Sequence, residues 1–389
     1  MSVRTIRTKL TLLLLVFGAL PLLGVMPIVI NKMEMMKQGR LDGMKTTAAT
    51  LGDLIDRNLF ERYGDVQAFG VNAATRDTRN WYKAGEANPL IVSMNAYMTN
   101  YGLYKLMVLV DMDGKVAAVN SADNKGNPLP VDDIYASNFK EAPWFAKAVR
   151  KEFSKGDTVD GTVVEQPNYA EVVAKTYQGQ DGYTITFAAP VFDYAGTMIG
   201  VWANFADFGL VEDIVKSAHA QKTSEGLEKI AFAIGDSNGR IMVNYDPAAR
   251  KEYEHRVSSV IGKKTLADMG IPVASTPSTP SGTAVEVDRS SGQKDAVGWA
   301  NTKGALGFSG MNWLIVMHQP ADYAFAEIVA GERLILMVCG VALVLLMIAG
   351  IVIGTLASRP LQKISCEINR LASGDFSTDV EGIRSRDEV

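Results

Sequence analysis

Two long apolar segments, residues 10–30 and 334–356, constrain this chain more than any other feature, because neither contains a charged residue. A helix rises 1.5 Å per residue, so about 20 apolar residues cross the roughly 30 Å hydrocarbon layer of a membrane. Each segment is therefore predicted to be a transmembrane helix. A cleaved signal peptide is the alternative for the first segment, since basic residues precede it. That segment is nevertheless long for a signal sequence, and no small-residue cleavage site follows it.

Basic residues flank both segments on the side away from the intervening region. Arg4, Arg7 and Lys9 precede the first segment, and no acid lies among residues 1–9. Arg359, Lys363 and Arg370 follow the second, where residues 357–371 contain a single acid, Glu367. Positive charge favours the cytoplasmic side. We therefore expect a two-pass protein of the cytoplasmic (inner) membrane, with residues 1–9 and 357–389 in the cytoplasm and residues 31–333 on the extracytoplasmic side.

The composition excludes several classes of protein. A net charge of −4 argues against a nucleic-acid partner. The two cysteines, Cys339 and Cys366, lie outside residues 31–333, so no disulfide stabilises that region and an ordinary core must do so. The three histidines are far apart, and no His, Cys and carboxylate spacing suggests a metal site or a catalytic group. We predict no enzyme activity, no metal and no cofactor.

The outer region begins with a helical pattern over residues 31–79. Apolar side chains recur there at spacings of three and four, as one face of a helix requires. They are Leu51, Ile55, Leu59, Tyr63, Val66 and Phe69. This helix either packs on the core of one domain or forms a stalk that also packs on a second copy of the chain, and the two roles are compatible.

An internal repeat follows the helix. The segments Asp111–Gly114 and Asp236–Gly239 each join two apolar strands, and each ends in a dipeptide (Asp-Gly or Asn-Gly) typical of a two-residue hairpin turn. The repeat predicts two related α+β subdomains, a distal one at about residues 85–215 and a proximal one at about 225–320. The first turn is not a calcium loop, because Leu109 and Asn120 would occupy loop positions that require carboxylates. Residues 271–294 are predicted to be mostly loop, with a strand at 284–287, and residues 311–317 to form a buried strand.

A series of short motifs links these features in order. They are the Asp111–Gly114 turn, Pro143-Trp144-Phe145, Pro190-Val191, Gly196–Val201 and the closing segment Trp313–Pro320. Over residues 31–333 this series resembles the double Cache sensing domain of bacterial chemoreceptors. The resemblance implies an α+β fold in which a long N-terminal helix supports two stacked PAS-like subdomains. Its ligand site would lie in the distal subdomain.

The segment after the second apolar stretch resembles a HAMP domain. Pro360 is expected to open a helix whose apolar residues follow spacings of three and four, as in a coiled-coil seam. These are Leu361, Ile364, Ile368 and Leu371. Gly374-Asp375-Phe376 would then end this helix, and Arg386–Val389 would begin a second one, so residues 357–389 are expected to be an incomplete HAMP domain.

The resemblance also suggests a ligand site. Family members that sense amino acids use an Arg two residues before the Trp, the Trp-aromatic pair itself, and an Asp in the final strand. This chain has Trp144 and Phe145, but Ala142 replaces the Arg, and Asn204 or Phe205 stands at the Asp position. Lys140 or Arg150 would have to substitute. The ligand-contact candidates are Tyr135, Trp144, Phe145, Tyr177, Tyr183, Asp193 and Asn204. An aromatic box with one acid suits an amine or another cation.

The function implied by the resemblance is that of a methyl-accepting chemotaxis protein. Such a receptor binds a small molecule outside the cytoplasmic membrane as a homodimer. It transmits the signal through the HAMP segment to a cytoplasmic adaptor and kinase. The sensor region of a histidine kinase or of a nucleotide cyclase receptor is the alternative. A membrane-tethered binding protein without a signalling role would not need the HAMP segment.

Overall fold

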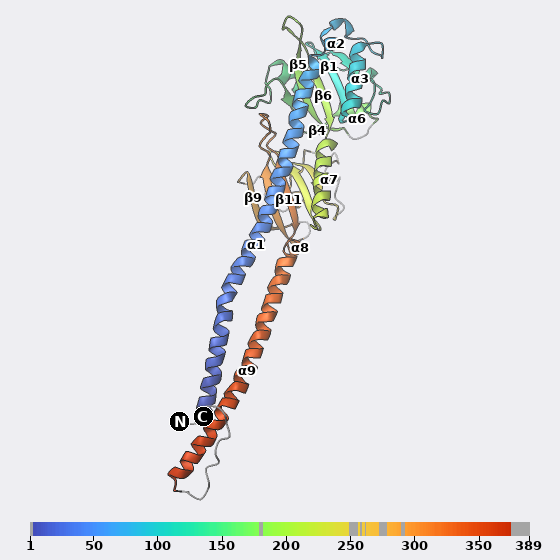
Figure 1. Cartoon of the computed structure of the whole chain (residues 1–389). Coiled ribbons are helices and arrows are strands. Elements are labelled where there is room, and N and C mark those ends of the chain that lie inside the picture. Colours follow the sequence, from blue (N-terminus) through green and yellow to red (C-terminus); the bar gives the residue numbers. More distant parts are fainter. Residues whose placement is uncertain are drawn as a thin grey trace. The chain divides into compact units, whose positions relative to one another are not determined.

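The computed structural model describes residues 3–178, 182–248, 256, 259–260, 262–271, 278–288 and 292–374 (Figure 1). The chain forms two compact units, which are described separately. Unit 1 contains Met1–Gly39 and Phe325–Val389, and unit 2 contains Arg40–Ala324. A long N-terminal helix, two antiparallel sheets and several short helices confirm the predicted α+β class.

Unit 1 is built from the first part of helix α1 (Val3–Gly70) and from helix α9 (Ala326–Ala372). Both helices are long and apolar enough to cross a membrane, and their apolar windows are almost entirely exposed. Thr11 Oγ1 donates a 3.3 Å hydrogen bond to the carbonyl oxygen of Gly350, so the two helices contact each other within this unit. Small residues permit such close approach between apolar helices.

The structure differs from the expectation at Pro360. This residue lies inside α9 instead of opening a separate helix. Proline removes one backbone hydrogen bond, which a long helix with intact turns on both sides tolerates. The described part of the helix ends at Ala372, and Gly374 has a positive φ of 87°. Asp375 and Phe376 of the predicted connector, together with Arg386–Val389, lie outside the described residues.

In unit 2, the second part of α1 supplies a buried face along its whole length. The six apolar residues predicted to form this face are each at most 2% exposed, which confirms the helical pattern. The helix approaches the proximal sheet very closely, because a Cβ atom placed on Gly298 would lie 2.3 Å from the backbone nitrogen of Lys45. Figure 1 shows α1 passing along both sheets of this unit.

The two sheets share one strand order. In the distal sheet the order is β2-β1-β6-β5-β3, with β4 paired to β5, and in the proximal sheet it is β8-β7-β11-β10-β9. The distal strands are β1 (Tyr104–Asp111), β2 (Val116–Val119), β3 (Val163–Val164), β4 (Asn168–Tyr169), β5 (Tyr183–Phe192) and β6 (Met198–Asp207). The proximal strands are β7 (Ala231–Gly235), β8 (Ile241–Tyr245), β9 (Ser281–Val287), β10 (Lys294–Asn301) and β11 (Leu314–Pro320). Apart from β4, each distal strand has a counterpart at the same place in the proximal sheet, so the internal repeat predicted from the two turns is confirmed.

The two repeated turns have the same hydrogen bonds. Oδ1 of Asp111 accepts from the backbone N–H groups two and four residues later, at 2.9 Å each, and Oδ1 of Asp236 does the same at 2.8 Å each. In both turns only the glycine, Gly114 or Gly239, has a positive φ, and a register shift follows in the adjoining strands. The turns are therefore a tight turn followed by a glycine bulge, and not the predicted two-residue type, which needs two positive φ angles.

Short helices cover both faces of the distal sheet. They are α2 (Ala73–Arg76), the 3₁₀ helix η1 (Thr78–Asn80), α3 (Pro89–Tyr101), α4 (Asp132–Tyr135), α5 (Pro143–Val149) and α6 (Glu171–Thr176). Helices α1 and α3 lie on one face, where the rings of Phe69 and Tyr97 stack 4.0 Å apart beside Trp202. Helices α4, α5 and α6 cover the other face. Helix α7 (Gly209–Ser224) joins the two sheets, and α8 (Ala321–Ala324) follows β11.

Candidate functional site

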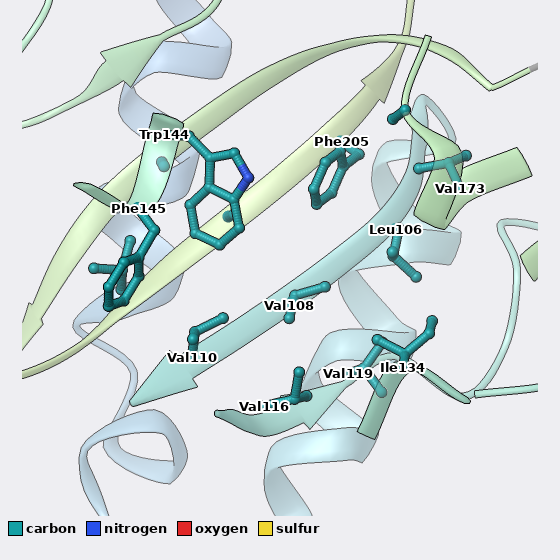
Figure 2. Packing of buried hydrophobic residues seen from close by; sticks show 14 of the residues in the cluster. Leu106, Val108, Val110, Val116, Val119, Ile134, Trp144, Phe145, Val173 and Phe205 are labelled. Atoms are coloured by element: carbon teal, nitrogen blue, oxygen red, sulfur yellow. The ribbon is translucent and has the colours of Figure 1, made fainter. Parts of the chain in front are cut away.

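The face of the distal sheet that α4, α5 and α6 cover carries a closed apolar cluster (Figure 2). We call it the distal cluster. Its buried members are Leu106, Val108, Val110, Val116, Val119, Val131, Ile134, Trp144, Phe145, Ala148, Val163, Ala170, Val173, Ala188, Val201, Ala203 and Phe205. Strand alternation places Val201, Ala203 and Phe205 of β6 on this face, because every second side chain points the same way.

Trp144 is the largest side chain of the distal cluster. Pro143 occupies the first turn of α5, where its missing N–H leaves no hydrogen bond unmade, and the next two residues point inward. The Trp144 ring meets Phe205 edge to face, with centroids 6.2 Å apart, and Phe139 at 5.6 Å. Figure 2 shows Trp144 between Phe145 and Phe205. These contacts are those of a packed aromatic core.

Two tyrosines stand at the edge of the distal cluster, and their hydroxyl groups differ. Tyr177 donates a 2.8 Å hydrogen bond to the carbonyl oxygen of Lys105, whose ammonium lies 5.3 Å from the Tyr177 ring centroid. The hydroxyl of Tyr135 is buried without a hydrogen-bond partner of good geometry. Burial raises its pKa, and the nearby backbone of Val119 opposes that rise. An unpaired buried hydroxyl is costly, so a ligand that offered it an acceptor would gain affinity.

The other three predicted residues lie away from Trp144. Tyr183 packs against Phe208 at 4.8 Å, and its hydroxyl donates to the carbonyl oxygen of Met242 in the proximal sheet at 3.2 Å. Asp193 closes the turn between β5 and β6, where its Oδ1 accepts two backbone hydrogen bonds of 2.8 and 2.9 Å. Asn204 lies on the face that packs against α1 and α3, and its Oδ1 accepts a 2.7 Å hydrogen bond from Nε1 of Trp202.

The distal cluster contains no charged side chain among the described residues. Ala142 packs against it where amino-acid sensors have an Arg, and Phe205 belongs to it near the position of the Asp. Neither of the proposed substitutes compensates for this. Lys140 is exposed, and Arg150 is exposed and paired with Glu152 at 2.7 Å. An amino acid would therefore find no ion-pair partner for its charged groups inside this cluster.

Among the pockets in the described part of unit 2, two lie beside the elements discussed above, and Tyr183 is the one predicted ligand-contact residue that lines either of them. One, of about 550 Å³, adjoins the distal cluster between α4 and α6. It is lined by Pro130, Asp133, Ile134, Ser137, Asn138, Phe139, Glu171, Val172, Lys175, Thr176 and Gln178. Ile134, Phe139 and Val172 line this pocket and also belong to the distal cluster or pack against it, so the pocket lies directly beside the cluster. The other pocket, of about 780 Å³, opens between the distal and proximal sheets.

Within the described ranges, no group of three or more His, Cys, Asp or Glu side chains is arranged to hold a metal ion. The only buried histidine–carboxylate pair there is His318 with Asp295, at 2.8 Å, and it joins neighbouring strands of the proximal sheet. This pair stabilises the sheet.

No family model matches the chain, and no curated protein matches it. Several solved structures are similar to it, and they include ligand-binding domains of bacterial chemoreceptors. The domain of Pseudomonas fluorescens CtaA in complex with L-leucine has 14% sequence identity and a TM-score of 0.48, over 75% of this chain and 99% of that chain. The domain of Pseudomonas aeruginosa PctC in complex with GABA has 16% identity and a TM-score of 0.47, over 72% and 99%. The domain of Campylobacter jejuni Tlp3 in complex with 4-methylisoleucine has 11% identity and a TM-score of 0.46, over 74% and 93%.

Proposed function

We propose that the chain is a two-pass receptor of the cytoplasmic membrane, of the methyl-accepting chemotaxis type. Unit 2 lies outside the cytoplasm and binds a small molecule in its distal subdomain. The positive charges that flank the two apolar segments support this orientation. The ordered series of sequence motifs supports the receptor class.

One observation carries the proposal. The chain enters unit 2 from one apolar helix and leaves it into another, with few residues between unit 2 and each helix. Helix α1 is unbroken from Val3 to Gly70 and supplies core residues to unit 2. At the other end, β11 lies between β7 and β10, and only α8 and Phe325 separate it from α9. A displacement of β11 therefore reaches an apolar helix within a few residues, as transmembrane signalling requires.

The chemistry of the distal cluster supports an uncharged ligand with an apolar body. No carboxylate lies among the aromatic side chains of the cluster, because that of Asp193 accepts hydrogen bonds within a turn elsewhere. An amine or another cation, the ligand expected from the sequence, would therefore find no anion to pair with in the cluster. The unpaired hydroxyl of Tyr135 supplies one hydrogen-bond donor among apolar walls. A small ketone, ester or aromatic compound with one acceptor atom would meet both features.

Signal transmission follows from differential binding. A ligand shifts a two-state receptor only by the difference between its affinities for the two states. Movements of about 1–2 Å at helix interfaces are typical of such transitions. We propose that the ligand draws α4 and α6 toward the distal sheet, and that a homodimer converts the resulting shift of α9 into altered packing on the cytoplasmic side.

A thermal-shift screen on the full chain in lipid nanodiscs tests the ligand proposal. The panel holds small ketones, esters and aromatic compounds, with amino acids and amines as the charged arm. A ligand at a hundred times its dissociation constant should stabilise the fold by about 2.7 kcal/mol. We expect hits in the uncharged arm that are lost in Trp144→Phe and kept in Trp299→Phe, a matched change in the proximal sheet. Hits confined to the charged arm, or retained in Trp144→Phe, would contradict a ligand site in the distal cluster.

A further inference from the structure

We propose that the pocket between the two subdomains is a second binding site, for a small organic carboxylate with an apolar body. This inference goes beyond the function proposed above and does not depend on a ligand in the distal cluster. The pocket has a volume of about 780 Å³ and belongs entirely to unit 2. Sites for small molecules commonly have volumes of about 300–1,000 Å³. Lys147 and Glu165 line it from the distal side, and Arg240 and Met242 from the proximal side.

The exposed charges of this pocket are positive. The side chains of Lys147 and Arg240 are each 43% exposed, whereas those of Glu165 and Asp236 are only 13% and 5% exposed. Lys263, which is also exposed, lines the pocket as a third cation. The acids are thus less accessible than the cations, and a ligand that enters the pocket meets the cations first. Charge complementarity favours an anion.

Arg240 is already held in place for such an anion. Its Nε and Nη2 atoms donate to Oδ2 of Asp236 at 2.7 and 2.6 Å. Oδ1 of Asp236 accepts from two backbone N–H groups of the β7–β8 turn, which fixes the carboxylate. A guanidinium has five donors in a rigid plane, so those not bonded to Asp236 remain for a carboxylate. The ligand gains from a cation whose ordering is complete before binding.

Lys147 is held more loosely on the opposite wall. Its ammonium lies 3.8 Å from Oε1 of Glu165, beyond the length of a good hydrogen bond. Burial raises the pKa of Glu165, and the Lys147 charge opposes that rise. The ammonium can therefore turn from Glu165 to a ligand at little cost. A carboxylate between Lys147 and Arg240 would join the distal subdomain to the proximal one.

The remaining lining distinguishes a carboxylate with an apolar body from inorganic phosphate. Val164, Met242 and Met311 line the same pocket, together with the ring of Tyr169. Phosphate would leave these walls in contact with water, whereas an aliphatic or aromatic carboxylate would cover them. Burial of apolar surface would then add to the ion pairs.

Helix α5 connects this site with the distal cluster. Pro143 and Lys147 are four residues apart on one face of the helix and both line the pocket, while Trp144 faces the cluster. A ligand that holds Lys147 against the proximal wall would change the position of Trp144. The two sites are therefore coupled, and each ligand alters the affinity of the other by the same factor.

Isothermal titration calorimetry on the full chain in lipid nanodiscs tests this site. The probes are isovalerate, benzoate and phenylacetate, with inorganic phosphate as the anion that lacks an apolar body. We expect at least one carboxylate to bind and phosphate not to bind. Lys147→Gln and Arg240→Gln should each weaken carboxylate binding by roughly tenfold or more, because each removes one charged hydrogen-bond donor. Glu165→Gln should strengthen it, because it removes the buried anion that competes for Lys147.

The opposite signs of these changes keep the test clear if one variant is unstable. Arg240→Gln leaves Asp236 buried without its cation, so its fold is checked by circular dichroism, and Lys147→Gln and Glu165→Gln test the site separately. Arg150→Gln is the matched control, since Arg150 is an exposed cation at the end of α5 whose partner is Glu152. Absence of carboxylate binding, equal binding of phosphate, or equal affinities in Lys147→Gln, Glu165→Gln and Arg150→Gln would overturn the proposal. Failure here leaves the proposal of a ligand in the distal cluster standing, because the thermal-shift screen with Trp144→Phe tests that site separately.

Discussion

Nε1 of Trp313 donates a 2.7 Å hydrogen bond to Oε1 of Gln166, and this contact ties the proximal sheet to the distal one. Trp313 is fully buried one residue before β11, and Gln166 lies between β3 and β4. The indole also meets Phe208 edge to face, with ring centroids 5.8 Å apart. The strand that precedes α8 and α9 is therefore anchored directly to the distal half of the unit.

Removal of the acceptor from this pair should destabilise unit 2. Gln166→Ala leaves the buried indole N–H without a partner, which costs about 1–3 kcal/mol. Trp313→Phe removes the donor as well, so the double variant should be less destabilised than the sum of the two single changes. Urea unfolding of all four proteins in a double-mutant cycle measures this coupling energy. Strict additivity would mean that the hydrogen bond contributes nothing.

The stability of unit 2 should fall as the pH rises through about 6, because of Asp56. This α1 carboxylate accepts hydrogen bonds from the N–H groups of Lys303 and Gly304 at 3.0 and 2.7 Å, but its other oxygen is buried without a partner. Burial raises its pKa from 3.8 to about 6, and Asp53 adds to the rise. The folded state therefore binds the proton more tightly than the unfolded state. The resulting stability is complete below about pH 4 and is lost toward pH 6, by roughly 3 kcal/mol in all.

Asp56→Asn should abolish this pH dependence and leave the protein at least as stable at pH 7, since the amide keeps an acceptor without the charge. Asp53→Asn, one turn earlier, changes an exposed carboxylate that is paired with Arg57. It should keep the pH dependence, with its upper limit moved to a slightly lower pH, because Asp53 is the smallest of the causes that act on the pKa of Asp56. Thermal denaturation at half-unit steps between pH 4 and 7 provides the measurement. A wild-type slope that persists in Asp56→Asn would assign the effect to another group.

Gly114 and Gly196 should respond differently to alanine, although both have positive φ angles, of 80° and 84°. A Cβ on Gly196 meets nothing within 4 Å, so Gly196→Ala should cost only the left-handed strain of about 1–2 kcal/mol. A Cβ on Gly114 would lie 2.4 Å from the backbone nitrogen of Lys140. Gly114→Ala should therefore cost about 1–3 kcal/mol more, the usual penalty of overpacking. Chemical denaturation of the two variants would show equal losses if the Lys140 backbone simply moved away.

The two tyrosines at the edge of the distal cluster provide a matched pair. Tyr177→Phe removes a hydroxyl that donates to Lys105, so it should destabilise the fold by about 1 kcal/mol. Tyr135→Phe removes a hydroxyl without a good partner, so it should leave stability unchanged or raise it. The same variant should weaken binding of any ligand found in the thermal-shift screen. A destabilised Tyr135→Phe protein with unchanged ligand affinity would assign this hydroxyl a structural role.

Single cysteines introduced along residues 334–356 should crosslink between subunits if the proposed homodimer signals through α9. Many side chains on this helix are exposed in a single chain, Leu334, Val341 and Leu345 among them. The native Cys339 and Cys366 are first replaced by serine. Crosslinks should recur with helical spacing along one face, because a packed pair of helices presents one stripe to its partner. A complete lack of crosslinks at every position would reject dimeric signalling through this helix.

Patterns of local spacing predicted much of the fold. The apolar residues from Leu51 to Phe69 identified the buried face of α1, and the two Asp-x-x-Gly segments identified the repeated hairpins. The exact turn type was beyond the sequence, because an Asp-Gly dipeptide is compatible with a two-residue turn and with a glycine bulge. Only the backbone φ angles and the hydrogen bonds to Asp111 distinguish these two turn types.

The candidate site was less predictable, because it depends on faces and on distant pairing. Asn204 and Phe205 are neighbours in β6, yet a shift of one residue moves a side chain to the opposite face of a sheet. Phe205 consequently meets Trp144, while Asn204 meets Trp202. Asp193 could have been excluded in advance, since Gly196 follows it in the same Asp-x-x-Gly pattern that was recognised at Asp111. The pocket between the subdomains is formed by residues from two sheets, and no local sequence pattern predicts that such distant residues lie close together.

The buried part of α1 packs against both sheets of unit 2. Asp56 bonds to the backbone of the proximal loop at Lys303 and Gly304, and two turns later the backbone oxygen of Tyr63 accepts a 2.8 Å hydrogen bond from Thr162 of the distal subdomain. If α1 detached from one sheet, the core that it forms with the other sheet would also be exposed to water. The two halves should consequently melt together as one cooperative block, with a single calorimetric peak. A conformational change in one half is then passed on to the other half, because no flexible joint separates them.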